Sequence, residues 1–266
     1  MANKRNSPIG VFDSGLGGLT VMKELMRQLP WEDIVYYGDT ARVPYGAKSK
    51  ESIIRFSVEN AEVLLRHNVK MIVVACNSSS SFALKTLKRK FRVPVVGVIR
   101  PGAKKAAALT RNQRIGVIAT TATIASGEYV KTVRWYNRRA RVFSRACPLF
   151  VPLAEEGWLT NPVTLQIARE YLEPLKKAGI DTLILGCTHY PLLRGVIQRA
   201  AGPGTSLVDS AREVAHEVDE LLTDDALNRT LQRTAHYTFF VSDRPQAFKK
   251  IARNFLGRGL THIAKV

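Results

Sequence analysis

The sequence contains few cysteines and no long apolar run. There are three cysteines in 266 residues, Cys76, Cys147 and Cys187. So small and odd a number argues against a disulfide framework and fits a reducing compartment. No run approaches the ~18 apolar residues that a membrane helix needs, and the first residues lack the apolar stretch of a signal peptide. These absences predict a cytoplasmic protein that does not enter a membrane.

Several cofactor motifs are absent as well. No GxxxxGK[ST] phosphate loop and no zinc-ligand spacing occurs. The glycine-rich segment that begins at Gly15 departs from the GxGxxG pattern, because Thr20 occupies the position of the third glycine. Asp13, at the entrance of this loop, would also repel a pyrophosphate. The loop therefore favours a substrate that carries an ammonium group, or a base beside a thiol, over a dinucleotide.

Acidic residues are also scarce relative to basic ones. The 40 Lys and Arg against 22 Asp and Glu give a net charge of +18, which attracts anions such as acidic metabolites, nucleic acid or anionic lipid. We interpret most of this charge as solvated basic helix faces. The sequence contains no zinc finger, basic zipper or RNP motif. Nucleic-acid binding is thus expected only as a non-specific side activity of the basic surface.

Short apolar runs alternate with longer amphipathic stretches along the chain. This pattern predicts an α/β fold of parallel sheets covered by helices on both faces. The expected strands are residues 9–13, 34–37, 71–75, 95–99, 115–119, 142–147, 183–186, 207–208 and 237–241. The expected helices include residues 17–29, 49–67, 82–91, 123–138, 165–177 and 211–222.

A weak internal repeat indicates two similar domains. IGVFDSG near the start resembles IGVIATT, and MIVVACN resembles TLILGCT. We expect one α/β domain from residues 1–98 with 211–266 and a second from residues 99–210, with the active site in the cleft between them. Ligands of open α/β sheets bind beyond the carboxyl ends of the strands. Both repeat cysteines, Cys76 and Cys187, are expected there.

The residues around these two cysteines are polar. Cys76 is followed by Asn77 and four serines, and then by a helix whose positive end favours a thiolate. Cys187 is followed by Thr188 and His189 at the start of another predicted helix. A single cysteine is most often an inert core residue, but two in matching polar contexts favour a joint chemical role. Cys147 lies among apolar residues and prolines and is expected to be structural.

Two further segments allow more than one interpretation. Glu155 and Glu156 follow an apolar stretch, and the spacing favours a functional role no more than a surface position. Tyr45 and Gly46 are typical of a turn, from which the residues alone predict nothing more.

Six ordered motifs extend through most of the chain. They are FDSGLGGLTV (12–21), YYGDTARVPYG (36–46), VACNS (74–78), ACPLFVPLAEEG (146–157), LGCTHYPLL (185–193) and VDSA (208–211). With these motifs the sequence resembles the glutamate racemases of the aspartate/glutamate racemase superfamily. The resemblance implies a two-domain α/β enzyme, usually a homodimer, that interconverts L- and D-glutamate for peptidoglycan synthesis without pyridoxal phosphate, metal or other cofactor.

The resemblance also implies roles for particular residues. Cys76 and Cys187 would be the two acid/base groups, with Asp13 assisting Cys76, and Glu155 and His189 assisting Cys187. The implied substrate-binding residues are Asp13, Ser14, Tyr45, Gly46, Asn77, Ser78, Thr188 and His189.

Two positions depart from the family pattern. Ser78 replaces the usual threonine and keeps its hydroxyl, while Arg100 stands where Glu or Gln is usual. His189 favours glutamate over aspartate, because aspartate racemases typically carry Glu at this position. The alternatives are an aspartate or other amino-acid racemase on the same scaffold, or a basic regulatory or nucleic-acid-binding protein with a racemase-like fold.

Overall fold

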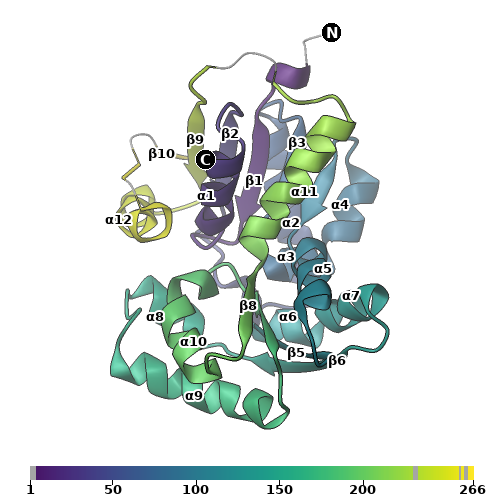
Figure 1. Cartoon of the computed structure of the whole chain (residues 1–266). Helices are drawn as coiled ribbons and strands as arrows, with labels where there is room; N and C mark the ends of the chain where they lie inside the picture. The colour runs from purple at the N-terminus through teal and green to yellow at the C-terminus, as the bar shows by residue number, and fades with distance from the viewer. Residues whose placement is uncertain (1–3, 230–232, 258, 261–262) are drawn as a thin grey trace. The chain divides into compact units, whose positions relative to one another are not determined.

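The computed structural model describes residues 4–229, 233–257, 259–260 and 263–266 (Figure 1). The chain divides into two compact units, each with its own core. Unit 1 consists of Met1–Val98 with Ala211–Val266, and unit 2 of Ile99–Ser210.

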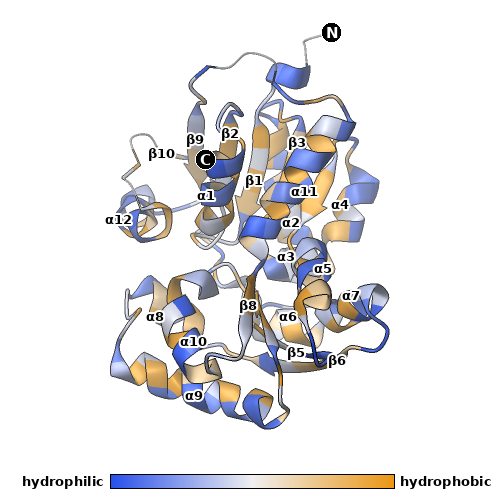
Figure 2. Cartoon of the chain, in the orientation of Figure 1, coloured by the Kyte–Doolittle hydropathy of each residue, from blue (hydrophilic) through white to orange (hydrophobic). Residues whose placement is uncertain are grey.

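Unit 1 is built on a parallel sheet in which the described strands have the order β10-β9-β2-β1-β3-β4. Its strands are β1 (Ile9–Asp13), β2 (Ile34–Gly38), β3 (Met71–Val74), β4 (Val95–Gly97), β9 (Tyr237–Val241) and β10 (Ile263–Lys265). The residues of β1, β2 and β3 are all buried, as expected for strands that are covered on both faces. Figure 2 shows the apolar character of β1 and β3.

Helices cover both faces of this sheet. They are α1 (Leu19–Gln28), α2 (Lys50–Leu65), α3 (Asn77–Phe82), α4 (Leu84–Lys90), α11 (Ser210–Asp224) and α12 (Pro245–Leu256), with short 3-10 turns η1 (Lys4–Asn6) and η2 (Tyr45–Ala47). On one face, Leu64 of α2 and Leu87 of α4 join a core cluster with Phe12 and Val35 of the strands. Tyr36 points to the other face, where its ring centroid lies 6.0 Å from that of Phe248 in α12.

Unit 2 has a parallel sheet with the strand order β6-β5-β7-β8 among the residues described. Its strands are β5 (Arg114–Ala119), β6 (Arg141–Ala146), β7 (Thr182–Gly186) and β8 (Ser206–Asp209). Its helical elements are α5 (Ile99–Leu109), α6 (Thr121–Ala125), α7 (Glu128–Tyr136), α8 (Phe150–Glu155), α9 (Pro162–Lys177), η3 (Tyr190–Leu193) and α10 (Arg194–Ala201).

The two faces of the unit 2 sheet have separate cores. Leu183 and Leu185 of β7 pack with residues of α8, α9 and α10. Ile184, between them, points the other way and packs with residues of α5 and α7. The predicted α/β class, with two parallel-sheet cores covered by helices, is thereby confirmed.

Two local predictions were wrong, and some elements were not expected. The strand expected over residues 95–99 ends at Gly97, because Ile99 begins α5, a helix that was not expected. The helix expected over 123–138 is divided into α6 and α7 at Gly127, whose φ of 66° lies in the left-handed region and interrupts a helix. The C-terminal elements α12 and β10 were not predicted. None of the described helices combines the length and apolar character needed to span a membrane.

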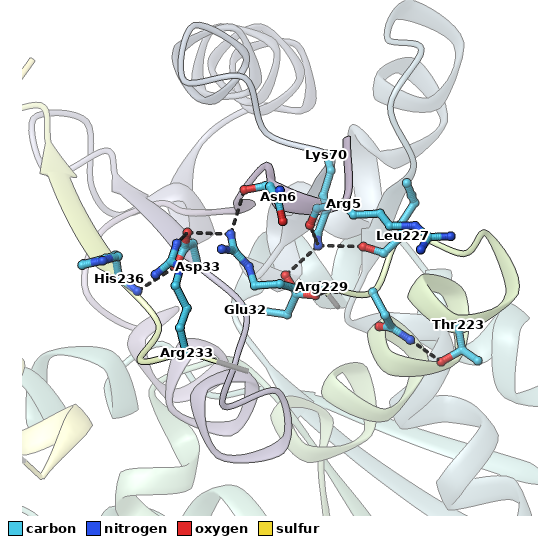
Figure 3. Close-up of polar contacts among 11 residues, drawn as sticks. Arg5, Asn6, Glu32, Asp33, Lys70, Thr223, Leu227, Arg229, Arg233 and His236 are labelled. Atoms are coloured by element: carbon cyan, nitrogen blue, oxygen red, sulfur yellow. Dashed lines mark hydrogen bonds and ion pairs between the residues drawn. The ribbon is translucent and has the colours of Figure 1, made fainter. Parts of the chain in front are cut away.

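A buried polar cluster joins the segment after α11 to the amino end of the unit 1 sheet (Figure 3). Lys70 Nζ lies 2.6 Å from Glu32 Oε2 and donates to the carbonyls of Arg5 and Leu227 at 3.0 and 2.8 Å. The backbone N–H of Arg229 donates to the other Glu32 oxygen at 2.8 Å. Burial lowers the pKa of Lys70, and the bond to Glu32 opposes that shift.

Breaking the Lys70–Glu32 pair should destabilise unit 1. Lys70→Ala leaves the Glu32 carboxylate buried without its cation, which is expected to cost about 3 kcal/mol in free energy of unfolding. Lys90→Ala is the matched control, because the Lys90–Glu62 pair is about half exposed on both sides and should be worth less than ~1 kcal/mol. Urea unfolding at neutral pH measures both. Equal losses in the two variants would contradict this account of the cluster.

Candidate functional site

In unit 1, the chemistry-bearing residues follow the carboxyl ends of adjacent strands. Asp13 is the last residue of β1, and Cys76 comes two residues after the end of β3. The strands pair directly, and the N–H of Ala75 donates to the carbonyl of Phe12 at 2.9 Å. Cys76 is only 6% exposed and Asp13 is fully buried. Cys76 therefore lies beyond the carboxyl end of its strand, as expected, and Asp13 lies at the same edge of the sheet.

The loop after β1 holds the Asp13 carboxylate in place. The N–H of Gly15 donates to Asp13 Oδ2 at 2.9 Å. Gly18 packs against the same side chain, and a Cβ at that position would lie 2.5 Å from the Asp13 Cβ. The glycines of this segment thus let α1 begin directly beside a buried carboxylate.

The environment of Cys76 favours its neutral thiol. Burial, followed by the negative charge of Asp13, raises the pKa of Cys76 to about 11, although the Ser79 N–H and the Ser14 and Ser79 hydroxyls act in the opposite direction. At pH 7, a pKa of about 11 means that ionising the thiol costs roughly 5 kcal/mol. Ser14 therefore contacts Cys76 as well as lying beside Asp13.

The expectation that a helix start would favour a thiolate was wrong for the resting protein. Cys76 does occupy the N-cap position of α3. Interaction with a helix end is worth about 0.3–1 kcal/mol, which is less than the cost of burying a charged sulfur beside a carboxylate. Asn77 and Ser78, in the first turn of the same helix, are both buried.

Tyr45 and Gly46 form the 3-10 turn η2, and the Tyr45 side chain is buried. Its hydroxyl donates to Asp39 Oδ2 and accepts from Asn60 Nδ2 at 3.1 Å. Burial and the Asp39 charge raise the pKa of Tyr45. Among the described contacts, Tyr45 therefore anchors its segment through the side chain, which leaves the backbone of Tyr45 and Gly46 as the part that could meet a ligand.

Sequence reasoning missed Asp39. Its fully buried carboxylate accepts from Arg42 Nε at 2.6 Å and from Ser242 Oγ at 3.0 Å, in addition to Tyr45. Asp39 directly follows β2 in the way that Asp13 ends β1, and this shared position at a strand end was the available signal. Asp39 thus connects the η2 segment to the end of β9.

In unit 2, Cys187 directly follows β7 and is 7% exposed. Its Sγ lies 3.8 Å from His189 Nδ1, and His189 Nε2 lies 2.9 Å from Glu155 Oε1 at the end of α8. The structure thus brings together three residues that the sequence assigned to one site. Thr188, between Cys187 and His189, is also buried.

The contacts of His189 favour its protonated form. Burial lowers its pKa, but the interactions with Cys187 and Glu155 outweigh burial and raise the pKa of His189 to about 10. At neutral pH the imidazolium can place a proton toward the Cys187 sulfur while Glu155 balances its charge. This arrangement is suited to stabilising negative charge on sulfur.

The segment around Cys187 is fixed by buried aromatic packing. Tyr190 donates its hydroxyl hydrogen to the Cys147 carbonyl at 2.8 Å, and its ring packs edge-on against Phe150 at 5.2 Å. Cys147 itself is fully buried in this core, and burial raises the pKa of its thiol. Its position is consistent with the structural role expected for it.

Arg100, the departure from the family pattern, lies in the first turn of α5. Its Nε donates to the Tyr136 hydroxyl at 3.0 Å, at the end of α7. Within the described residues, no group of three or more His, Cys, Asp and Glu side chains could hold a metal ion. Each unit thus holds a buried thiol beside an ionisable group, Cys76 beside Asp13 in unit 1 and Cys187 beside His189 in unit 2.

Comparison with known proteins identifies the family of this chain. The Asp/Glu/Hydantoin racemase family matches residues 9–218. A glutamate racemase of Geobacter metallireducens is 51% identical, over 97% of this chain and 96% of its own. The crystal structures of the Bacillus anthracis glutamate racemase isoform RacE1 and of a Francisella tularensis glutamate racemase with D-glutamate are each 38% identical, cover 98% of both chains and have TM-scores of 0.93 and 0.92.

The chain therefore belongs to the Asp/Glu/Hydantoin racemase family, and within it to the glutamate racemases. The resemblance carried by the six motifs is confirmed, and the protein is an amino-acid racemase, an isomerase.

The charge on His189 should depend on Glu155. Glu155→Gln keeps an oxygen acceptor but removes the negative charge, so the pKa of His189 should fall by about one unit or more from about 10. NMR titration of the imidazole measures the shift. The matched control is Glu156→Gln, which changes the adjacent exposed glutamate and should leave His189 unaffected. An unchanged His189 titration in Glu155→Gln would refute the assigned contact.

Proposed function

We propose that this protein interconverts L- and D-glutamate by proton transfer at Cys76 and Cys187. The observation that carries the proposal is that each cysteine lies just after the end of a parallel strand, is almost fully buried, and has its own ionisable neighbour. That neighbour is Asp13 for Cys76 and the His189–Glu155 pair for Cys187. The two cysteines are proposed to act on opposite faces of one substrate.

Two acid/base groups on opposite faces of the substrate explain how the configuration of its α-carbon is inverted with little movement. One sulfur, as thiolate, takes the α-proton from one face of glutamate, and the other, as thiol, donates its proton to the opposite face of the resulting carbanion. By its resemblance to the family, Cys76 acts on the D-isomer and Cys187 on the L-isomer. After each turnover the thiol and thiolate have exchanged places, so the reverse reaction uses the same groups.

The two helper groups have different tasks in this scheme. Asp13 disfavours the Cys76 thiolate, so its charge must be offset before Cys76 acts as a base. The ammonium group of a bound amino acid next to Asp13 supplies that compensation. The His189 imidazolium supports negative charge on Cys187 from the start.

Backbone and side-chain polar groups around the cysteines would bind the substrate. We assign this role to Asp13, Ser14, Tyr45, Gly46, Asn77, Ser78, Thr188 and His189. The α-carbon is a very weak acid, so alignment of the reacting atoms and hydrogen bonds to the developing carbanion must supply most of the rate enhancement.

Glutamate is proposed as the substrate over aspartate. His189 is the residue expected for the glutamate branch, and a relative of similar fold from Francisella tularensis was crystallised with D-glutamate. The further proposals are that the enzyme acts as a cytoplasmic homodimer, uses no pyridoxal phosphate or metal, and supplies D-glutamate for peptidoglycan.

Removing either sulfur should abolish racemisation. Cys76→Ala and Cys187→Ala are each expected to lower kcat in both directions by about 10³-fold or more, because each direction needs one base and one acid. Cys147→Ala is the control, since that buried thiol has no assigned step. Polarimetry with L- or D-glutamate measures the rates, and normal turnover in either active-site variant would rule out the two-base scheme.

Solvent hydrogen should enter the product. The proton that completes the inversion comes from a thiol that exchanges with water, so turnover of L-glutamate in D₂O should give D-glutamate deuterated at the α-carbon without any added cofactor. Mass spectrometry of the separated isomers measures the label. A requirement for added pyridoxal phosphate, or a product free of deuterium, would overturn the proposed reaction.

A further inference from the structure

Ser79 differs from the serines beside it. Its side chain is completely buried, and its Oγ has no hydrogen-bond partner among the described residues. The hydroxyl of Ser80, the next residue, donates to the Val74 carbonyl at 2.9 Å, and that of Ser81 donates to the Ser78 carbonyl at 2.9 Å. A buried hydroxyl without a partner is uncommon and costs stability, so its presence calls for an explanation.

The group that Ser79 faces is the Cys76 sulfur. Cys76 is the N-cap residue of α3, and the residue three positions later returns to the same side after one helical turn. Both the N–H and the hydroxyl of Ser79 lie close enough to the sulfur to lower the pKa of Cys76. A neutral thiol is a weak hydrogen-bond acceptor, which explains why the hydroxyl is not fully engaged in the resting protein.

The other groups around this sulfur come from two neighbouring strands and one loop. Asp13 of β1 opposes a negative charge on the sulfur, and the hydroxyl of Ser14 in the following loop supports it. Tyr36 of β2 is also close, but its hydroxyl donates to the Gly15 carbonyl at 2.8 Å. Of these neighbours, Ser79 is the one whose donor is buried and not otherwise used.

We propose that Ser79 is a positioning residue for Cys76, whose hydroxyl completes a hydrogen bond to the sulfur only when the thiol has lost its proton. The unpartnered hydroxyl then destabilises the resting protein, and the hydrogen bond that it forms with the thiolate removes this penalty. The inference rests on the proposed function in that it gives the thiolate of Cys76 a catalytic purpose, but the hydrogen bond itself can be tested without turnover.

The direct test is the reactivity of Cys76 in Ser79→Ala. Alkylation by iodoacetamide requires the thiolate, and peptide mass spectrometry separates Cys76 from Cys147 and Cys187. Loss of one charge-assisted donor should move the pH midpoint of Cys76 alkylation upward by about one unit. Ser57→Ala is the matched control, because Ser57 is equally buried in α2 but its hydroxyl donates to the Ile53 carbonyl at 2.7 Å.

Stability and kinetics separate positioning from simple packing. Because the Ser79 hydroxyl is unpartnered in the resting protein, Ser79→Ala should not lower the urea midpoint of unfolding. The kcat for D-glutamate should fall about tenfold, with KM nearly unchanged, since the hydrogen bond forms at the reacting sulfur.

Either of two results would overturn the inference. One is a pH midpoint of Cys76 alkylation that is the same in Ser79→Ala as in the wild-type protein. The other is a Ser79→Ala chain that unfolds more easily or fails to fold, since the hydroxyl would then be holding the resting structure together. A failure of the two-base scheme appears separately, as continued racemisation in Cys76→Ala.

Discussion

The structure depends on keeping two thiols nearly out of water at the carboxyl ends of parallel strands. Cys76 and Cys187 are 6% and 7% exposed, and burial of this kind works against any charge on sulfur. A proposed base that is protected from water must therefore obtain its charge stabilisation from fixed neighbours. Much of the local architecture can be understood as supplying those neighbours, from the Gly15 and Gly18 loop around Asp13 to the Tyr190 contact with the Cys147 carbonyl.

The two units meet this constraint in different ways. In unit 2 His189 stands beside the sulfur and contacts Glu155, and these two contacts raise the pKa of His189 to about 10. In unit 1 the nearest charge is the carboxylate of Asp13, which disfavours a thiolate, and the compensating donors are hydroxyls and a backbone N–H. We infer that the Cys187 side is prepared for negative charge before substrate arrives, whereas the Cys76 side becomes prepared with substrate. Both sheets are parallel, so the difference between the two cysteines comes from the side chains beside them, a carboxylate at Cys76 and an imidazole at Cys187.

The sequence could predict the features that local pattern controls. Apolar runs such as MIVV and LILG indicated buried parallel strands, and a polar residue after each strand indicated the edge where Cys76, Asp13 and Cys187 lie. It could not predict the burial of Cys76, because that depends on chain segments that pack from far away in sequence. For the same reason Tyr45 looked like an ordinary turn residue, and the network of Asp39 with Ser242 was missed. The break between α6 and α7 at Gly127 depends on a left-handed backbone conformation, which an amphipathic sequence pattern does not reveal.

The central claim is that one glutamate molecule contacts both sulfurs. The most direct measurement is protection of the cysteines from alkylation across a glutamate titration, resolved residue by residue with mass spectrometry, with Cys147 as an internal reference. The account predicts that Cys76 and Cys187 become protected together, with the same half-maximal glutamate concentration. Protection of only one of them, or two clearly different concentrations, would contradict it.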